Sequence, residues 1–421
     1  MTNSKLQTYN QSQHGISSDE ISPSALAIIT KLLDHNYKAY IVGGAVRDLL
    51  LSKHPKDFDI ATDATPEQIK DVFQSKCRII GRRFRLAHVY HNREMYEVAT
   101  FRGVAEAGDR VVKEGHILRD NIFGSIDQDA MRRDFTCNAL YYDIENGNVL
   151  DFCGGVDDIN QHKLKFIGES TKRIIEDPVR MIRAIRFQAK LGLNMVENLY
   201  QAIQNQHHTI ENVSTARLFD ELVKLFHCGN AFVAYGLMND LRLFKHIFPQ
   251  AIKAINAETN NLTLIHNALK STDSRIKQGK SVTPIFLFAC FLWPLALQKS
   301  NAYLAQGVSK YDATNKAAND VFVISRKSLA IPKIIQIGIR NIWLLQNRFH
   351  FTRGKKVFFT LEQHRFRAAY DFLLLRSHES SEIQALGDWW THIQTLSKTK
   401  QKDMVFPNNN HKKNAPKKNK K

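Results

Sequence analysis

The stretch KAYIVGGAVRDLLLSKHPKDFDIAT, residues 38–62, contains the pattern that determines the fold of the first half of the chain. A short β-type run, KAYIV, ends at Gly43-Gly44, and AVRDLLL reads as a helix that opens directly after the glycines. A second strand around FDIAT follows. A strand, a glycine turn, a helix and another strand in so few residues are typical of a compact α/β domain.

The segments around this stretch extend the same pattern. Apolar residues at helical spacing occur in SALAIITKLLDHN, residues 24–36, and TPEQIKDVF, residues 65–73, is a second helix with Thr65 as N-cap and Pro66 in its first turn. Short β-rich segments follow close together over residues 78–102. We therefore expect an α/β head with a small mixed or antiparallel sheet.

The second half of the chain changes to helical patterns from about Lys172 onward. Its longest apolar run, IFLFACFLWPLAL from Ile285 to Leu297, contains Pro294 and is shorter than the roughly 20 residues that a membrane span requires. We expect a buried helix there, no membrane span and a cytoplasmic protein. An all-helical second half follows from this pattern.

The charge balance is strongly basic, with 59 Lys and Arg against 41 Asp and Glu and a formal net charge of +18. Such an excess favours a polyanionic partner, nucleic acid before acidic lipid, although a basic surface can also serve solubility alone. The last 26 residues carry nine lysines and one acid, Asp403, and read as a disordered electrostatic arm. The five cysteines are scattered and form no C-x-x-C pair, which suits a reducing compartment.

Asp57 and Asp59 are the first candidate site residues. Side chains two apart in a strand point to the same face, so the two carboxylates repel one another unless a cation lies between them. Mg²⁺ takes one or two carboxylates together with phosphate oxygens, which makes a nucleotide-handling metal site one interpretation. An exposed acidic pair at a strand end is the other, because D-x-D alone is a weak signal.

Gly43 and Gly44 lie between a strand and a helix, where bare backbone N–H groups can hold a phosphate. Arg47, near the start of that helix, could donate to a triphosphate. The alternatives are a plain tight turn for the glycines and a salt bridge with Asp48 for the arginine. The sequence at this point leaves both alternatives open.

Two further clusters combine arginine with aspartate. Arg132, Arg133 and Asp134 stand at the head of an apolar run, where guanidinium groups can bind phosphate or ribose, or can form a structural ion pair. Asp177 precedes Pro178 in EDPVRMIRAIRF and has the form of an N-cap. In the helix that follows, three arginines share one 120° arc, which faces either solvent or an anion. These are Arg180, Arg183 and Arg186.

The order of these motifs resembles a known family. G-G-x-V-R-D-x-L-L, then D-x-D, then R-R-D-F-T-x-N-A-L, then E-D-P-x-R is similar to the nucleotidyltransferase head of the class II tRNA CCA-adding and bacterial poly(A) polymerase family, over about residues 38–230. The resemblance implies that Asp57 and Asp59 bind Mg²⁺ or Mn²⁺. It also implies a catalytic or a ribose-orienting role for Asp134, with Glu97 as another acidic candidate.

The same resemblance implies the nucleotide-binding residues. Those for the triphosphate and ribose are Gly43, Gly44, Arg47, Arg132 and Arg133, with Asp134 beside them, and those for the base are Asp177, Arg180 and Arg183. Segments 81–89, 119–134, 364–376 and 387–390 look like the poly(A) polymerase branch. That branch adds AMP from ATP to single-stranded RNA 3′ ends, with the RNA-degradation machinery as a candidate partner. Completion of tRNA CCA ends, and an RNA-binding module with an inactive head, are the rival hypotheses.

Five parts of the chain follow from the pattern and the resemblance together. We expect a flexible N-terminus (1–24), a catalytic head (25–160), a helical nucleotide- and RNA-binding neck (161–235), a helical RNA-binding body (236–395) and a disordered basic tail (396–421).

Overall fold

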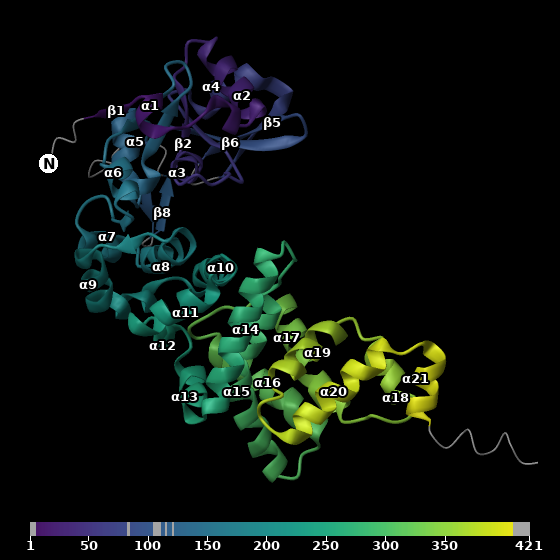
Figure 1. Ribbon diagram of the computed structural model, residues 1–421. Coiled ribbons are helices and arrows are strands. Elements are labelled where there is room, and N and C mark those ends of the chain that lie inside the picture. The colour runs from purple at the N-terminus through teal and green to yellow at the C-terminus, as the bar shows by residue number, and fades with distance from the viewer. Residues whose placement is uncertain (1–5, 82–84, 104–110, 114–115, 120–121, 407–421) are drawn as a thin grey trace, which may run out of the picture. The chain divides into compact units, whose positions relative to one another are not determined.

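The computed structural model describes residues 6–81, 85–103, 111–113, 116–119 and 122–406 (Figure 1). The contacts divide the chain into two compact units. Unit 1 comprises Met1–Arg180 and Leu191–Gln206, and unit 2 comprises Met181–Lys190 and His207–Lys421. The division between the units thus falls inside the expected neck, 161–235, while the five-part division itself stays a prediction.

Unit 1 contains a mixed eight-stranded sheet in the order β1-β10-β9-β2-β3-β6-β5-β4, which confirms the expected α/β head. Neighbouring strands run antiparallel except for β3 and β6, which are parallel. The strands are β1 (Gln7–Tyr9), β2 (Ala39–Val42), β3 (Asp59–Thr62), β4 (Cys77–Ile80), β5 (Leu86–His91), β6 (Glu94–Thr100), β9 (Leu140–Asp143) and β10 (Asn148–Asp151). Two further two-stranded sheets pair β7 (Val111–Lys113) with β8 (His116–Arg119), and β11 (Lys163–Leu164) with β12 (Asn194–Met195).

Two capped helices, α2 (Pro23–Leu33) and α4 (Pro66–Phe73), contact each other and β5 (Figure 1). The expected cap at Thr65 is present, because its hydroxyl accepts from the Gln68 N–H at 3.3 Å while the Gln68 side chain accepts from the Thr65 N–H at 2.8 Å. This reciprocal pairing satisfies N–H groups that a helix start leaves without partners. The remaining helices of this unit are α1 (Gln11–His14), α3 (Gly44–Leu50), α5 (Ile126–Arg132), α6 (Gly155–Asn160), α7 (Ser170–Glu176) and α9 (Glu197–Gln206), while α8 (Val179–Leu191) contributes to both units.

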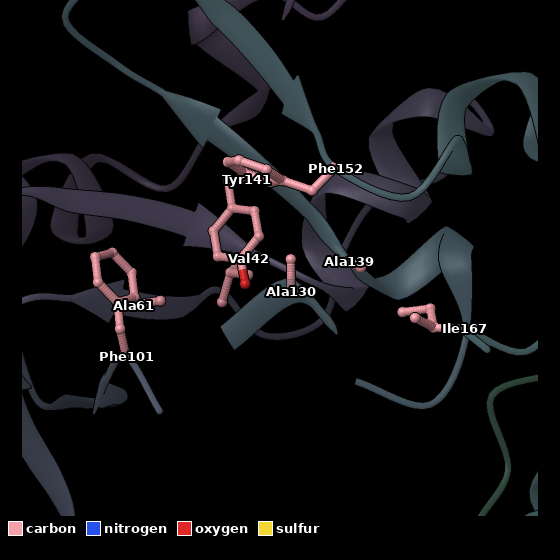
Figure 2. Packing of buried hydrophobic residues seen from close by; sticks show 8 residues of the cluster. All are labelled: Val42, Ala61, Phe101, Ala130, Ala139, Tyr141, Phe152 and Ile167. Atoms are coloured by element: carbon pink, nitrogen blue, oxygen red, sulfur yellow. The ribbon is translucent and has the colours of Figure 1, made fainter. Parts of the chain in front are cut away.

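A core of aromatic and small apolar side chains joins the central strands to α5. Tyr141 lies between Phe101 and Phe152, with ring centroids 6.4 Å and 6.0 Å away, and both pairs meet edge to face (Figure 2). Ala130 and Ala139 provide the small surfaces against which these rings pack. The core therefore fixes α5, which carries the first of the two arginine clusters, against β9.

The N-terminus differs from the expectation of a flexible segment over residues 1–24. Within the described residues from 6 onward, β1 pairs antiparallel with β10, and Ile16 is buried. His14 Nε2 lies 3.0 Å from the Gly147 carbonyl oxygen, so the segment is held by side chains as well as by the sheet. The prediction was wrong because a polar strand is stabilised here by pairing with a partner far away in the sequence.

Unit 2 is helical, as expected. Its central helix is α15 (Pro284–Ala305), which contacts α13, α14, α16, α17 and α19. By length and composition α15 could span a membrane, but 67% of its apolar window is buried inside the protein, which is the position of a core helix. The other helices are α10 (Thr215–Phe226), α11 (Ala231–Asp240), α12 (Phe244–Ile247), α13 (Pro249–Ala257), α14 (Thr259–Lys277), α16 (Lys310–Ser325), α17 (Lys333–Phe349), α18 (Lys356–Leu361), α19 (Phe366–Leu375), α20 (Ser381–Thr395) and α21 (Lys398–Val405).

Helix α21 corrects the expectation that residues 396–421 are disordered. Ser397 caps this helix, and Val405 is buried. The Gly354 N–H donates to the Val405 carbonyl oxygen at 3.3 Å, and the Phe406 ring stacks on Phe358. Burial of Val405 and the stacking of Phe406 on Phe358 therefore hold the lysine-rich segment in place. The rest of the expected tail, 407–421, lies outside the described residues.

Candidate active site

The turn between β2 and α3 forms a backbone cradle. Gly43 has φ 72° and ψ −116°, a conformation that side-chain-bearing residues rarely adopt, and its N–H donates to the Leu140 carbonyl oxygen at 3.0 Å. A Cβ atom on Gly43 would lie 3.1 Å from Arg133 Nη1, and one on Gly44 would lie 3.6 Å from Arg47 Nη2. Two guanidinium groups therefore flank the two glycines, as the phosphate-binding interpretation requires.

Arg47 is almost completely buried and is fixed by side-chain partners. Its Nε and Nη2 atoms donate to Asp48 Oδ1 at 2.8 Å and 2.6 Å, and its Nη1 atom donates to Asn138 Oδ1 at 2.5 Å. The salt-bridge alternative for Arg47 is thus present. The same pairing places the guanidinium beside Gly44. A salt bridge with Asp48 and a role as a donor to a triphosphate are therefore compatible, and the second stays a prediction.

Arg133 is held by a carboxylate and a phenol. Its Nε and Nη2 atoms lie 3.2 Å and 3.0 Å from Asp129 Oδ2, and its Nε atom lies 3.2 Å from the Tyr141 hydroxyl oxygen. The Tyr141 hydroxyl donates to Asp129 Oδ2 at 2.6 Å. Burial by itself would lower the pKa of Arg133, but Tyr141 and Asp129 raise it, so the guanidinium stays charged next to Gly43.

Arg132 has a different environment from its neighbour. It ends α5, and its Nη1 atom donates to the Gly103 carbonyl oxygen. The side chain is half-buried. The two adjacent arginines therefore take different partners, and Arg133 is the one whose guanidinium lies beside Gly43.

Asp59 is the first residue of β3 and Asp57 lies two residues before the strand begins, and both are exposed. Asp59 pairs with Val42 in the register of β2 and β3, which places it opposite the residue before Gly43. Partial burial raises the pKa of Asp59, and the charges of Glu97 and Asp57 raise it further, whereas the charge of Arg133 lowers it.

These effects describe a site that gathers negative charge next to a fixed guanidinium. In the part of the chain that the structure describes, no group of three or more His, Cys, Asp or Glu side chains is arranged to hold a metal ion. Two carboxylates still fit Mg²⁺, because this ion commonly completes its shell with water and substrate phosphate oxygens. The mutual repulsion of Asp57 and Asp59 is what such a cation would relieve.

Asp134 belongs to an ion-pair network with residues of α7 and α8. Arg180 Nε donates to Asp134 Oδ1 at 2.7 Å, and Arg173 Nη2 lies 3.7 Å from the same oxygen. Glu176 Oε2 accepts from both arginines at 2.9 Å. The side chains of Asp134, Arg173 and Arg180 are largely buried, whereas Glu176 is exposed. The partners of Asp134 are therefore the arginines of α7 and α8, and its catalytic or ribose-orienting role stays a prediction.

The base-binding candidates lie around the start of α8. Asp177 is half-buried between α7 and α8, and its carbonyl oxygen accepts from the Arg180 N–H at 3.1 Å. Asp177 is the C-cap residue of α7, and α8 begins at Val179, directly after Pro178, so the expected N-cap role of Asp177 stays a prediction. Arg183 lies in the segment of α8 that belongs to unit 2, where its side chain is half-buried. A role for Arg183 at the base therefore stays a prediction.

The sequence did not predict four residues that hold the candidate arginines and Asp134 in place. These are Asn138, Asp129, Tyr141 and Arg173. Asp129 stands four residues before Arg133 on α5, a spacing at which opposite charges meet, and this signal could have identified it. The contact from Arg173 to the carbonyl oxygen of Arg133, at 2.7 Å, joins residues 40 apart. No local pattern indicates such a pairing.

Family models match most of the chain. Residues 39–165 match the poly A polymerase head domain, residues 192–255 match the probable RNA and SrmB-binding site of polymerase A, and residues 306–421 match the polymerase A arginine-rich C-terminus. The chain is 42% identical over 404 residues to poly(A) polymerase I of Salmonella typhi, covering 93% of this chain and 87% of that protein.

CCA-adding enzymes are also similar, over less of the sequence. The enzyme of Lactobacillus helveticus is 34% identical over 267 residues, which cover 60% of this chain and 65% of that protein. The crystal structure of the Bacillus stearothermophilus CCA-adding enzyme in complex with CTP matches with a TM-score of 0.59 and 25% identity, covering 89% of this chain and 84% of that chain.

Proposed function

This chain belongs to the bacterial poly(A) polymerase family of nucleotidyltransferases, and from that premise we propose that it adds AMP from ATP to RNA 3′ ends without a template, releasing pyrophosphate. The observation that carries the proposal is the position of Arg133, whose guanidinium lies beside Gly43 and whose charge acts on Asp59. One guanidinium thus serves both the phosphate cradle and the acidic pair. Such an arrangement suits a triphosphate bound next to a metal.

Asp57 and Asp59 would hold Mg²⁺ or Mn²⁺. When bound, the metal would lower the pKa of the RNA 3′-hydroxyl and neutralise charge on the triphosphate as pyrophosphate leaves. Burial is the main cause of the raised pKa of Asp59, and the negative charges of Glu97 and Asp57 raise it further; a bound cation would relieve the repulsion among these charges.

The triphosphate would lie against Gly43 and Gly44, where no side chain separates it from the backbone. Arg47 and Arg133 would place two positive charges beside the triphosphate and donate charge-assisted hydrogen bonds to its oxygens. Their partners Asp48 and Asp129 fix both groups in advance, so little side-chain entropy is lost when the substrate binds.

Base selection would fall to Asp177 and Arg180, with Arg183 as a third contributor. No template is available to pair with the incoming base, so protein donors and acceptors must read its edge. Asp134 would act as a positioning residue, because it fixes Arg180 through a 2.7 Å hydrogen bond. Arg132, fixed on the Gly103 carbonyl oxygen, would stand beside the ribose.

Completion of tRNA CCA ends is the second candidate function, supported by the fold and by relatives that match a smaller part of the chain. The test is to incubate the pure protein with unstructured RNA and Mg²⁺, with each nucleoside triphosphate singly and with CTP and ATP together. Long tails with ATP alone would support polyadenylation. Addition that requires CTP and stops after C, C and A would refute it.

We further propose that the enzyme works in the cytoplasm on single-stranded RNA ends, in contact with the RNA-degradation machinery. The match of residues 192–255 to a family model described as a probable RNA and SrmB-binding site supports both an RNA and a protein contact in this part of the chain. Co-purification of the full-length protein from its own cells, with and without ribonuclease treatment, would separate direct protein contacts from those bridged by RNA.

A further inference from the structure

Unit 2 contains a groove that the proposed reaction does not use. A pocket of about 560 Å³ lies between α16, α17 and α18, and a neighbouring pocket of about 240 Å³ shares Tyr311, Arg348 and Gln363 with it. The larger volume falls within the roughly 300–1,000 Å³ of pockets that hold small ligands. We call the two together the body groove.

Three aromatic side chains of the body groove are unusually exposed for their type. Tyr311, Phe351 and Phe359 are 52%, 45% and 59% accessible to solvent. Phe351 and Phe359 expose apolar rings, which costs solvation free energy that a soluble surface normally avoids. A cluster of exposed rings in one groove therefore indicates a ligand with flat faces.

The same groove is positively charged. Lys310, Arg348 and Lys356 line the larger pocket and Arg365 lines the smaller one, while neither lining contains an acidic residue. None of the four forms an ion pair with a described residue, in contrast to Arg376, which is paired with Glu379. Lys356 Nζ lies 4.2 Å from the centroid of the Phe351 ring, so a cation and a ring are presented together.

We propose that the body groove binds single-stranded RNA by stacking bases on Tyr311, Phe351 and Phe359 while the surrounding cations contact the phosphates. Single-stranded nucleic acid is bound in this way when sequence must not matter, because every base has a flat face. The proposal rests on the proposed function, since an enzyme that lengthens RNA needs a hold on the strand away from the 3′ end.

Charge complementarity excludes the other occupants available from this chain. Residues 407–421 contain six lysines and no acid, so they carry the same sign as the groove. A second copy would present the same four cations to one another. A polyanion with flat bases satisfies both features of the groove, the rings and the unpaired charges.

The first experiment measures binding of the full-length protein to labelled oligoadenylate by fluorescence anisotropy. Phe359→Leu keeps an apolar side chain but removes the ring, and Phe359→Trp keeps a ring. We expect Phe359→Leu to weaken binding about 5–50-fold and Phe359→Trp to retain it, as base stacking predicts. Val323→Ala, at an equally exposed apolar residue of the same unit, is the matched control and should bind as wild type.

A second pair of variants tests the charges. Arg348→Gln with Lys356→Gln should weaken binding and reduce its salt dependence, whereas Lys277→Gln with Lys280→Gln, at exposed lysines outside the groove, should have a smaller effect. Equal binding by Phe359→Leu and wild type would overturn the proposal. So would equal losses in Phe359→Leu and Phe359→Trp, because a retained ring would then make no difference to binding.

RNA binding at the body groove can be tested separately from AMP transfer at the active site. AMP incorporation into the same oligoadenylate is measured in parallel, and the groove variants should raise KM for RNA while kcat stays within about twofold of wild type. A wild-type protein that binds oligoadenylate through the groove but transfers no AMP would refute the proposed function alone. An active wild type with unaffected groove variants would refute the groove alone.

Discussion

Asp129→Asn tests whether the arginine at the glycine cradle is held in place for the nucleotide. Asp129 is buried, and its Oδ2 atom accepts from two nitrogens of Arg133 and from the Tyr141 hydroxyl. Asparagine has nearly the same shape and keeps one acceptor oxygen. The substitution therefore removes the negative charge while it leaves the volume of the core unchanged.

The size of the effect follows from the three hydrogen bonds. Removing one partner of a buried ion pair outright costs about 3–5 kcal/mol. Hydrogen bonds to charged groups contribute about 1.5–3 kcal/mol each, and the amide oxygen retains part of this. We expect a loss of about 2–3 kcal/mol in the free energy of unfolding, together with a drop of about 10–100-fold in kcat/KM for ATP, which corresponds to about 1.4–2.7 kcal/mol.

The assay combines urea unfolding with AMP incorporation at saturating RNA, at a temperature where the variant is folded. Tyr141→Phe is the control, because it removes the 2.6 Å hydrogen bond to Asp129 but leaves the carboxylate with Arg133. It should lose about 1 kcal/mol of stability and keep most of the activity. A folded Asp129→Asn protein with unchanged kcat/KM for ATP would refute the claim that Arg133 acts on the triphosphate.

Three further substitutions test other parts of the structure. Gly338→Ala should lower the free energy of unfolding by about 1–3 kcal/mol in thermal melts, because its Cβ would lie 2.6 Å from Ile285 Cδ1; an unchanged melting temperature would contradict this packing. Burial and the neighbouring His246 lower the pKa of His207. As the pH falls, His207 therefore takes up a proton in the unfolded chain before it does so in the folded protein. The packing of neutral His207 stabilises the fold fully only above about pH 6.5. Stability should therefore fall as the pH drops below that value, and His207→Gln should flatten the dependence; an unaltered pH profile would exclude the contribution. Arg180→Lys keeps the charge but loses the planar fork, and should reduce the preference for ATP over the other nucleotides in single-nucleotide assays by about tenfold. Preserved selectivity would remove Arg180 from base recognition.

Local sequence patterns predicted the elements whose signals are local. The strand, glycine turn and helix around Gly43 have the expected form, and Thr65 caps α4 as its spacing with Gln68 indicates. The acidic residues Asp57 and Asp59 are exposed, and the charge of Arg133 acts on Asp59, while their role at a metal stays a prediction. Each of these features depends on residues within a few positions of one another.

Features that depend on distant pairing could not be predicted in the same way. Strand β1 has no apolar pattern of its own and is defined by its pairing with β10. The network around Asp134 joins it to Arg180, which is 46 residues away in the sequence. The family resemblance identified both residues as candidates, but it did not predict that they pair with each other. Helix α21 shows that a lysine-rich segment can be ordered when a capping serine and one buried valine, Val405, outweigh its composition.

The acidic pair is tested most directly by AMP incorporation in Asp57→Asn and Asp59→Asn, measured beside the unfolding curve of each variant. Both substitutions keep the side-chain volume and remove the charge that would hold the metal, so both proteins should fold with at least wild-type stability because repulsion is relieved. Incorporation should fall below a few per cent of wild type over a wide range of Mg²⁺ concentrations. Substantial incorporation by both folded variants would contradict metal-dependent nucleotidyl transfer at this pair.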